Sequence, residues 1–312
     1  MALHKIVLKN EHLHASFSKD YEPILTIQSG DSIECMTPDI GWGYNDTQGQ
    51  RTNFHSRLKE QEWGHPMIGP IYIQEAKPGM ALKIQIDQIT PAHYGWNCAG
   101  GNQSWHSSIL GVDQMEETTL DWEIDRDHMT GKTRIGERSF TVDLEPFMGV
   151  MAVAPEEPGV HPTIPPDRFG GNIDCKELAE GSTLYLPVFV EGALFSVGDG
   201  HAKQGDGEVS GQAIECPMDS VVLKIEAVDM QLNGPLADTP KGWMTFGFHE
   251  DLNEATIMAL NEMVQFIQQK YEVTKTEAVT LASTAVDLHI TQIVNGVKGV
   301  HAILPHNAFK VS

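Results

Sequence analysis

The stretch at residues 184–208, LYLPVFVEGALFSVGDGHAKQGDGE, decides the fold class because it joins two different patterns. Up to Val197 it holds two short apolar runs, separated by Glu191 and Gly192, and such runs are typical of buried β-strands. The apolar part is also too short to span a bilayer. After Val197, glycines alternate with acidic and imidazole side chains. The sequence therefore predicts a rigid strand that leads into a polar site.

Similar strand patterns fill most of the chain up to about residue 250. We expect strands at residues 3–9, 24–34, 69–73, 82–86, 120–153, 183–190, 193–197, 209–215 and 220–229. The Pro78-Gly79 turn predicts a hairpin between two of them, 69–73 and 82–86. Loops are expected in the polar or Pro/Gly-rich segments 37–65, 96–108 and 155–174. The 29 glycines and 17 prolines favour many short strands over long helices.

The pattern changes near residue 251, where Asp251 and Glu254 have the spacing of a helix capping box. The following apolar residues recur at helical spacing: Ile257, Leu260, Val264, Ile267 and Tyr271. Thr274 and Glu277 repeat the capping signal and predict a second helix that ends near Ala285. Strand-like alternation returns over 286–295 and 297–304.

We therefore expect a mainly β, β-sandwich-like fold with a C-terminal helical pair, and α+β is the minor alternative. The chain shows no internal repeat and no linker, so we expect one unit over residues 1–312. It would comprise a β-rich body (1–250), a helical insertion (about 251–285) and returning strands (286–305).

Charge and cysteine use limit the partners and the compartment. Acidic residues outnumber basic ones 43 to 21, for a formal net charge of −22, and such a surface repels nucleic acid and anionic lipid. The first ten residues have no apolar segment typical of a secretion signal. None of the four cysteines lies in a Cys-x-x-Cys spacing, so we expect free thiols in a reducing cytoplasm. A homo-oligomer is the default expectation for a soluble enzyme.

The densest group of chemistry-bearing residues is Asp199, His201, Asp206 and Glu208. Residues two apart point to the same face of an extended segment, and the intervening glycines let the backbone approach a ligand closely. One imidazole with several carboxylates suits a divalent metal, with Zn²⁺ favoured and Ca²⁺ kept open. The spacing fits neither a calcium-binding EF-hand nor a phosphate-binding loop. The alternative is a surface hairpin whose glycines and acids only form turns.

A second segment upstream, Gly170-Gly171-Asn172-Ile173-Asp174, is also flanked by glycine and supplies an amide and a carboxylate. His161 lies in the loop just before it and is the best candidate outside the two segments. His55 and His65, in the long loop at 37–65, come next.

Several segments together make the chain similar to the acetamidase/formamidase family. They are PILTIQSGDSI (23–33), GPIYI (69–73), PGMAL (78–82), GGNID (170–174) and, above all, the whole stretch 184–208. The hairpin QEAKPGM (74–80) departs from the family pattern, since a glycine and an acid are missing. The resemblance covers nearly the whole chain. It implies a β-sandwich-like enzyme that hydrolyses short amides to a carboxylate and ammonia, with Asn172, Asp174 and the run from Asp199 to Glu208 lining the site.

On this basis we expect Asp174, Asp199 and His201 to hold a divalent metal that activates water. Glu208, with Asp206 in reserve, would be the general acid and base. Asn172, Gln204 and His161 would contact the substrate, a small amide, with Asn172 or Gln204 donating to its carbonyl oxygen.

Two alternative functions stay open at this stage. One is a metallohydrolase of another C–N bond, such as a cyclic amide or ureide. The other is a non-catalytic β-sandwich, stabilised by Ca²⁺, that binds a sugar or peptide.

Overall fold

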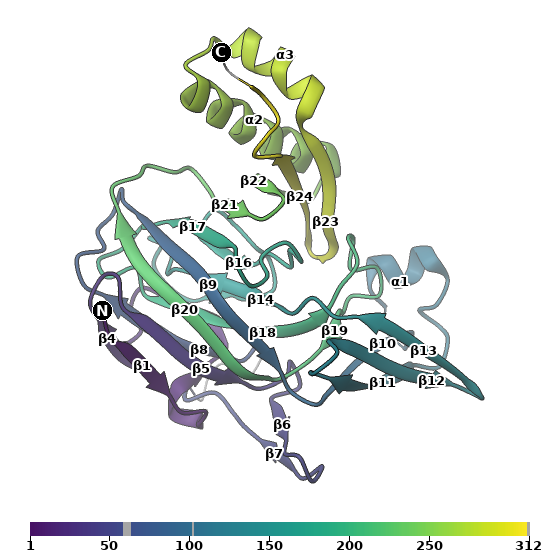
Figure 1. Ribbon diagram of the computed structural model, residues 1–312. Helices are drawn as coiled ribbons and strands as arrows, with labels where there is room; N and C mark the ends of the chain where they lie inside the picture. The colour runs from purple at the N-terminus through teal and green to yellow at the C-terminus, as the bar shows by residue number, and fades with distance from the viewer. Residues whose placement is uncertain (59–63, 102, 311–312) are drawn as a thin grey trace.

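The computed structural model describes residues 1–58, 64–101 and 103–310, and most of their strands belong to two large sheets (Figure 1). The first sheet has nine strands, in spatial order β1 (Leu3–Ile6), β5 (Ser32–Thr37), β20 (Met218–Val228), β9 (Ala81–Pro91), β17 (Thr183–Pro187), β21 (Leu236–Thr239), β22 (Gly242–His249), β24 (Val297–Leu304) and β23 (Asp287–Asn295). Strand β9 shows why the sheet forms here: its apolar residues alternate with polar ones, and the apolar side is buried.

The second sheet has eleven strands. Its main path runs β13 (Arg138–Asp143), β12 (Thr130–Ile135), β11 (Thr118–Asp125), β10 (Tyr94–Ala99), β19 (Ile214–Glu215), β18 (Phe195–Lys203), β14 (Phe147–Ala152) and β16 (Gly170–Asn172). Strand β8 (Met67–Ile73) pairs with β18 and also with β2 (Leu13–His14) and β4 (Leu25–Ile27). Two small ribbons complete the β-structure: β3 (Ser16–Phe17) with β15 (His161–Pro162), and β6 (Gly43–Asn45) with β7 (Arg51–Asn53).

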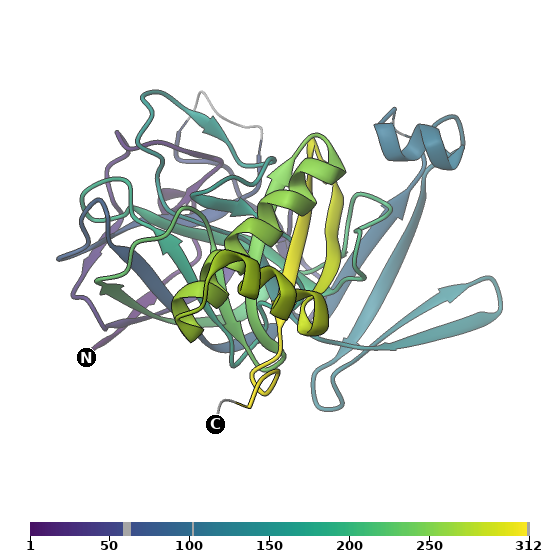
Figure 2. The ribbon, with the colours of Figure 1, turned by 90° about the horizontal axis from the view of Figure 1, so that it is seen from above.

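One continuous apolar core is shared by the two sheets. It joins side chains of β9, β17 and β20 in the first sheet to side chains of β8, β14 and β18 in the second, so the sheets are packed layers of one body. Strands β10 to β13 extend away from this body as a ribbon (Figures 1 and 2). The mainly β fold with a helical pair near the C-terminus is confirmed.

The helical pair is α2 (Leu252–Tyr271) and α3 (Lys275–Ala285), and both predicted N-terminal caps are present. The Asp251 carboxylate accepts the backbone N–H groups of Asn253 and Glu254 at 2.8 and 3.2 Å. Thr274 and Glu277 form the reciprocal capping box. The pair packs through a small apolar cluster against β24, over the end of the nine-stranded sheet (Figure 2).

Two shorter helices complete the secondary structure: a 3₁₀ turn, η1 (Asn10–His12), and α1 (Trp105–Leu110). None of the helices in the described part of the chain has the length and apolarity that a bilayer-spanning segment needs.

Several local expectations were wrong, and one of them is the loop expected at 155–174, which contains the short strands β15 and β16. The segments 69–73 and 82–86 do not form a hairpin, because β8 pairs in the second sheet and β9 in the first. The segment 96–108 is not a loop: it holds most of β10 and the start of α1, whose first turn is capped by Ser104. Of the strand expected at 209–215, only Ile214 and Glu215 are extended. Part of the long loop at 37–65 lies outside the described residues, and the rest contains β6 and β7.

The contact between α2 and β22 gives a test of the packing. A Cβ atom at Gly247 would collide with the backbone carbonyl of Ala255 and lie 2.6 Å from the backbone nitrogen of Ala259. We expect Gly247→Ala to lower the free energy of unfolding by about 1–3 kcal/mol, measured by urea denaturation. Gly234→Ala is the control, since that position is open, and it should change stability by less than about 1 kcal/mol. Equal stability of the two variants would contradict the packing.

Candidate functional site

Strand β18 places two of the predicted residues at the centre of the second sheet. Asp199 and His201 lie two apart on this strand, as the alternation requires, and each is only 1% exposed. Glu215 of the neighbouring strand β19 pairs in register with His201. The antiparallel pairing therefore adds a third titratable side chain from a distant part of the sequence.

Asp174 enters from a different direction, just after β16. Its side chain accepts a hydrogen bond from Nδ2 of Asn295 at 2.5 Å, and its backbone carbonyl accepts one from Nε2 of Gln204 at 2.8 Å. Glu208 follows a turn in which its N–H donates to the carbonyl of Gly205. These side chains and their partners thus come from segments around residues 174, 200, 208, 215 and 295.

The His201 ring lies between the acids. Its Nε2 is 3.4 Å from Oδ2 of Asp199 and 3.5 Å from Oε2 of Glu215, and its Nδ1 is 3.8 Å from Oδ1 of Asp174. Two trios have potential ligand atoms within 4.8 Å of one another: Asp174, His201 and Glu208, and Asp199, His201 and Glu215. We use the name acid–imidazole cluster for these five residues.

Unpartnered polar atoms converge on the acid–imidazole cluster. In the described part of the chain, ten buried side-chain atoms lack a hydrogen-bond partner. Seven of the ten belong to the cluster and its neighbours: Asn172 Oδ1, Asp174 Oδ1, Asp199 Oδ1, His201 Nδ1, Gln204 Oε1, Glu208 Oε2 and Glu215 Oε2. Buried polar groups are nearly always paired in folded proteins, so this concentration indicates a place for a ligand.

The protonation equilibria point to a missing positive charge. Burial raises the pKa of Asp174 and Glu215 above the usual range, and it raises the pKa of Glu208 far above it. Burial disfavours the charged form of His201. The attraction of Asp199 and Glu215 is stronger than this effect, and it holds the pKa of the ring well above its usual value. Burial alone would raise the pKa of Asp199, but the attraction of His201 and His65 is stronger and lowers this pKa. One imidazole does not balance four buried acids, and a cation would.

The backbone at the acid–imidazole cluster is strained. Asp174, Asp199 and Glu208 have φ angles of +52°, +60° and +48°, in the left-handed region that side chains other than glycine rarely adopt. Strain of this kind persists only where the surrounding structure enforces it, and it is concentrated at functional sites.

Gly149 of β14 keeps a small space open beside the cluster. A Cβ atom at this position would lie 2.5 Å from Oδ1 of Asp174, 2.5 Å from Oδ2 of Asp199 and 2.9 Å from Cε1 of His201. These three side chains therefore border one small space, which only glycine at position 149 leaves free. Two carboxylate oxygens face this space and suit a divalent cation, whereas His201 borders it with the ring carbon Cε1, one bond from each ring nitrogen.

The structure places the remaining predicted residues differently. Asn172 and Gln204 are buried next to Asp174. Asp206 lies outside the cluster, paired with Lys176 at 2.9 Å and with His289 at 3.2 Å. Burial opposes its charge, but Lys176 outweighs this and holds the pKa of Asp206 low, so it is ionised and neutralised there.

The three candidate histidines also differ in position. His161 is half-exposed on β15, with its Nε2 at 3.2 Å from the backbone carbonyl of Glu157. His55 contacts Asn10 at the surface. His65 approaches the acid–imidazole cluster, with Nε2 at 4.0 Å from Asp199, and Thr163 holds its other nitrogen at 2.7 Å.

Three residues in or beside the cluster carry no signal in the sequence: Glu215, Asn295 and Gly149. Glu215 and Gly149 join the site through strand pairing in the second sheet, whereas Asn295 ends β23 of the first sheet and reaches Asp174 with its side chain. Glu215 in particular sits in a two-residue strand, which is too short for periodicity to reveal.

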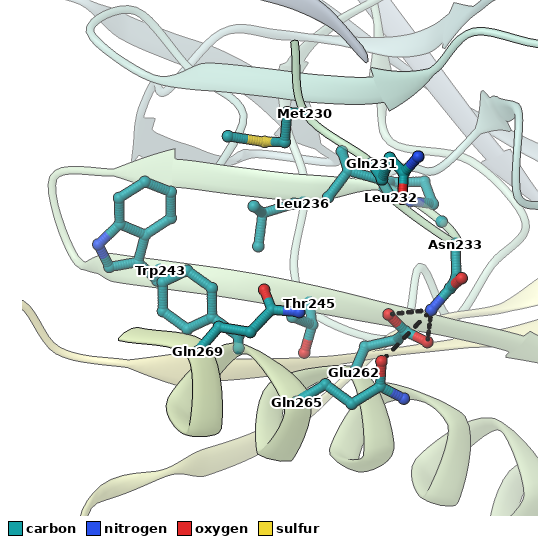
Figure 3. Close-up of a pocket in the computed structure, with 13 residues that line it drawn as sticks. Met230, Gln231, Leu232, Asn233, Leu236, Trp243, Thr245, Glu262, Gln265 and Gln269 are labelled. Atoms are coloured by element: carbon teal, nitrogen blue, oxygen red, sulfur yellow. Dashed lines mark hydrogen bonds between the residues drawn. The ribbon is translucent and has the colours of Figure 1, made fainter. Parts of the chain in front are cut away.

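A separate pocket of about 160 Å³ lies between the segment 230–236, β22 and α2 (Figure 3). Figure 3 shows Trp243 at one end and, at the other, the amide of Asn233 bonded to Glu262 and Gln265. None of its lining residues belongs to the acid–imidazole cluster. Its polar side chains are mostly amides, so it lacks the acid–base and ligand groups that the cluster has.

The chain is similar to proteins that are named acetamidase or formamidase. Residues 159–233 match the model of the acetamidase/formamidase family. A segment of 48 residues, 15% of this chain, is 54% identical to an acetamidase of Mycolicibacterium smegmatis, and this match spans 12% of that protein's length.

Two solved structures are similar over nearly their full length. One is a predicted acetamidase/formamidase from Thermoanaerobacter tengcongensis, with 30% identity, a TM-score of 0.82 and coverage of 97% of this chain and 96% of that one. The other is an acetamidase from Bacillus halodurans, with 30% identity, a TM-score of 0.82 and coverage of 96% and 97%. With its fold, its site and these similarities in agreement, the chain belongs to the acetamidase/formamidase family.

Proposed function

We propose that this protein hydrolyses short-chain aliphatic amides, such as formamide and acetamide, to a carboxylate and ammonia. The observation that carries the proposal is the convergence of unpartnered atoms of Asp174, Asp199, His201 and Glu208 in one buried cluster. Amide hydrolysis needs an activated water, stabilisation of a tetrahedral oxyanion and a proton for the leaving nitrogen. The cluster offers residues suited to each need.

Asp174, Asp199 and His201 would hold a divalent metal beside Gly149. The space that Gly149 leaves open supports the two carboxylates as ligands, because an oxygen of each borders it. His201 would need to turn one ring nitrogen toward the ion, since its carbon Cε1 faces this space. We favour Zn²⁺ because one ligand is an imidazole, whereas Ca²⁺ takes six to eight oxygen ligands. When bound, such an ion lowers the pKa of its water to about 7 and polarises a carbonyl oxygen.

Glu208 is the residue that we assign as general base and then general acid. It shares a trio with Asp174 and His201, so its carboxylate lies within 4.8 Å of a ligand atom of each. In this role Glu208 takes a proton from the attacking water and later gives it to the departing nitrogen. The products are then ammonia and a carboxylic acid, which releases its proton to solvent to give the carboxylate, and Glu208 ends as it began.

Asn172 and Gln204 are suited to recognise the amide nitrogen. Gln204 donates its Nε2–H to the backbone carbonyl of Asp174, so its unpartnered atom is the acceptor Oε1. Oδ1 of Asn172 is likewise an unpartnered acceptor. Two acceptors suit the two N–H donors of a primary amide, and this replaces donation to the carbonyl oxygen as their proposed role.

We also infer a reducing, cytoplasmic location and a homo-oligomeric state. All four cysteines are free thiols, which supports the first inference. The prevalence of symmetric oligomers among soluble enzymes supports the second, and sedimentation analysis tests it directly.

Replacement of the proposed proton carrier tests the mechanism. We expect Glu208→Gln to fold and bind metal but to lose about 10²–10⁴-fold in kcat, because it cannot carry the proton. Ammonia release from acetamide measures kcat, and elemental analysis measures the metal. The exposed residue Glu180 provides the control, Glu180→Gln, which should leave kcat unchanged. Near-normal turnover of Glu208→Gln would remove Glu208 from the mechanism.

A methyl group at the proposed metal position tests the metal assignment. Gly149→Ala should weaken Zn²⁺ binding at least tenfold, because its Cβ would compete with the ion for the space between Asp174 and Asp199. Calorimetric titration of the metal-free protein measures this affinity. Gly205→Ala is the matched control, since nothing lies within 4 Å of that position. The assignment fails if both variants bind Zn²⁺ as tightly as the unmodified chain.

A substrate series tests the recognition of primary amides. Acetamide should be preferred over N-methylacetamide and over a five-membered cyclic amide, because a secondary amide leaves one buried acceptor unpaired. That loss costs about 1–3 kcal/mol, or roughly 5- to 150-fold in kcat/KM. Amine-specific detection follows all three reactions. A preference for the cyclic amide would instead favour the alternative C–N hydrolase.

A further inference from the structure

A second buried cluster, formed by Cys175, Glu177 and His301, lies next to the acid–imidazole cluster in the chain. Cys175 directly follows Asp174, and His301 lies on β24. Cys175 and His301 have no solvent exposure, and Glu177 is 6% exposed. We use the name thiol cluster for these three residues, which have no role in the proposed hydrolysis.

The ligand atoms of the thiol cluster are spaced for a metal ion. Sγ of Cys175 is 3.3 Å from Oε2 of Glu177, and this oxygen is 3.7 Å from Nε2 of His301. Tetrahedral zinc has bonds of about 2.3 Å to sulfur and about 2.0 Å to nitrogen or oxygen, which puts neighbouring ligand atoms roughly 3.3–3.5 Å apart. These two separations need changes of only a few tenths of an ångström, and the ligand atoms of all three residues lie within 4.8 Å of one another.

The His301 ring offers the nitrogen that such a site needs. Nδ1 of His301 and Oγ1 of Thr291 are 2.8 Å apart. If Nδ1 carries the proton and donates it to Thr291, Nε2 presents a lone pair toward Glu177. Among the described residues, Nε2 has no hydrogen-bond partner although the ring is completely buried. An unpaired buried nitrogen that faces a carboxylate indicates a missing ligand.

Glu177 is fixed in the same manner. Its second oxygen, Oε1, is 3.2 Å from Nζ of Lys241, and its backbone carbonyl accepts a hydrogen bond from Ser182 at 2.8 Å. Oε2 is thereby held toward Cys175 and His301. Supporting contacts of this kind orient metal ligands in proteins.

A catalytic thiol is the competing explanation, and the geometry disfavours it. Sγ of Cys175 donates to Glu177, and its distance to Nδ1 of His301 is 4.0 Å, at the limit for a sulfur hydrogen bond. That nitrogen is already paired with Thr291. A thiol with no solvent exposure also gives a substrate no access.

We propose that Cys175, Glu177 and His301 form a second divalent-metal site, selective for Zn²⁺, that fastens the segment after β16 to β24. Binding releases the thiol proton to solvent, so that sulfur coordinates as thiolate. The fastened segment carries Asp174, and β23, the hairpin partner of β24, ends at Asn295, whose amide donates to Asp174. The site would therefore hold Asp174 in place. The proposal does not depend on amide hydrolysis.

Cobalt titration of the full chain distinguishes the two sites. Co²⁺ replaces Zn²⁺, and a thiolate ligand gives it a charge-transfer absorption band in the near ultraviolet. The acid–imidazole cluster contains no sulfur, so only the thiol cluster can produce this band. The metal-free protein should gain the band on addition of Co²⁺, and Glu208→Gln should gain it equally.

Cys175→Ser should abolish the band, whereas Cys216→Ser should keep it, because Cys216 is a buried free thiol outside the cluster. Thr291→Val preserves side-chain size and leaves every ligand in place. It should lower Co²⁺ affinity about 10–100-fold, as loss of a supporting contact does. Circular dichroism confirms folding of each variant. A missing band in the unmodified chain, or a band that survives Cys175→Ser, would overturn the proposal.

Discussion

The burial of four carboxylates around one imidazole is the constraint on which the rest of the site depends. Burying a charge without a partner is unfavourable, because the charge loses its water. Only an opposite charge or neutralisation by a proton offsets this desolvation free energy. Four acids surround His201, and each has one oxygen without a hydrogen-bond partner: Asp174, Asp199, Glu208 and Glu215. The strained backbone at three of these acids adds to the cost. A bound cation would offset the desolvation of these carboxylates. It would also explain why Gly149 leaves a space beside Asp174 and Asp199.

The fold meets this constraint with strands for Asp199 and Glu215, and with the segments that follow β16 and β18 for Asp174 and Glu208. Strand β18 carries Asp199 and His201, β19 carries Glu215, and the segment after β16 carries Asp174. The C-terminal hairpin adds Asn295, whose amide holds Asp174. Residues fixed on strands keep their geometry better than residues on loops, which suits a site that must not collapse when it is charged. The helical pair packs against β24, so the C-terminal part of the chain also supports the site.

Sequence patterns identified the parts of the site that are local. Alternation placed Asp199 and His201 on one face, and flanking glycines drew attention to Asp174. The sequence patterns did not identify Glu215, Asn295 and Gly149. These residues reach the site through pairing and packing between distant segments, which no local period encodes. The same reason explains the error at residues 69–86: the turn at Pro78-Gly79 was identified, but β8 and β9 enter different sheets. The helix caps at Asp251 and Thr274 were predictable because capping depends only on neighbours three residues away.

Anomalous diffraction from crystals of this protein soaked in Zn²⁺ tests the central claim most directly. Data collected on both sides of the zinc absorption edge locate the ion without reference to activity. We expect an anomalous peak within about 2.0–2.2 Å of a carboxylate oxygen of Asp174, a carboxylate oxygen of Asp199 and a ring nitrogen of His201. Density that shows only water between these side chains, with zinc bound elsewhere or not at all, would contradict the account.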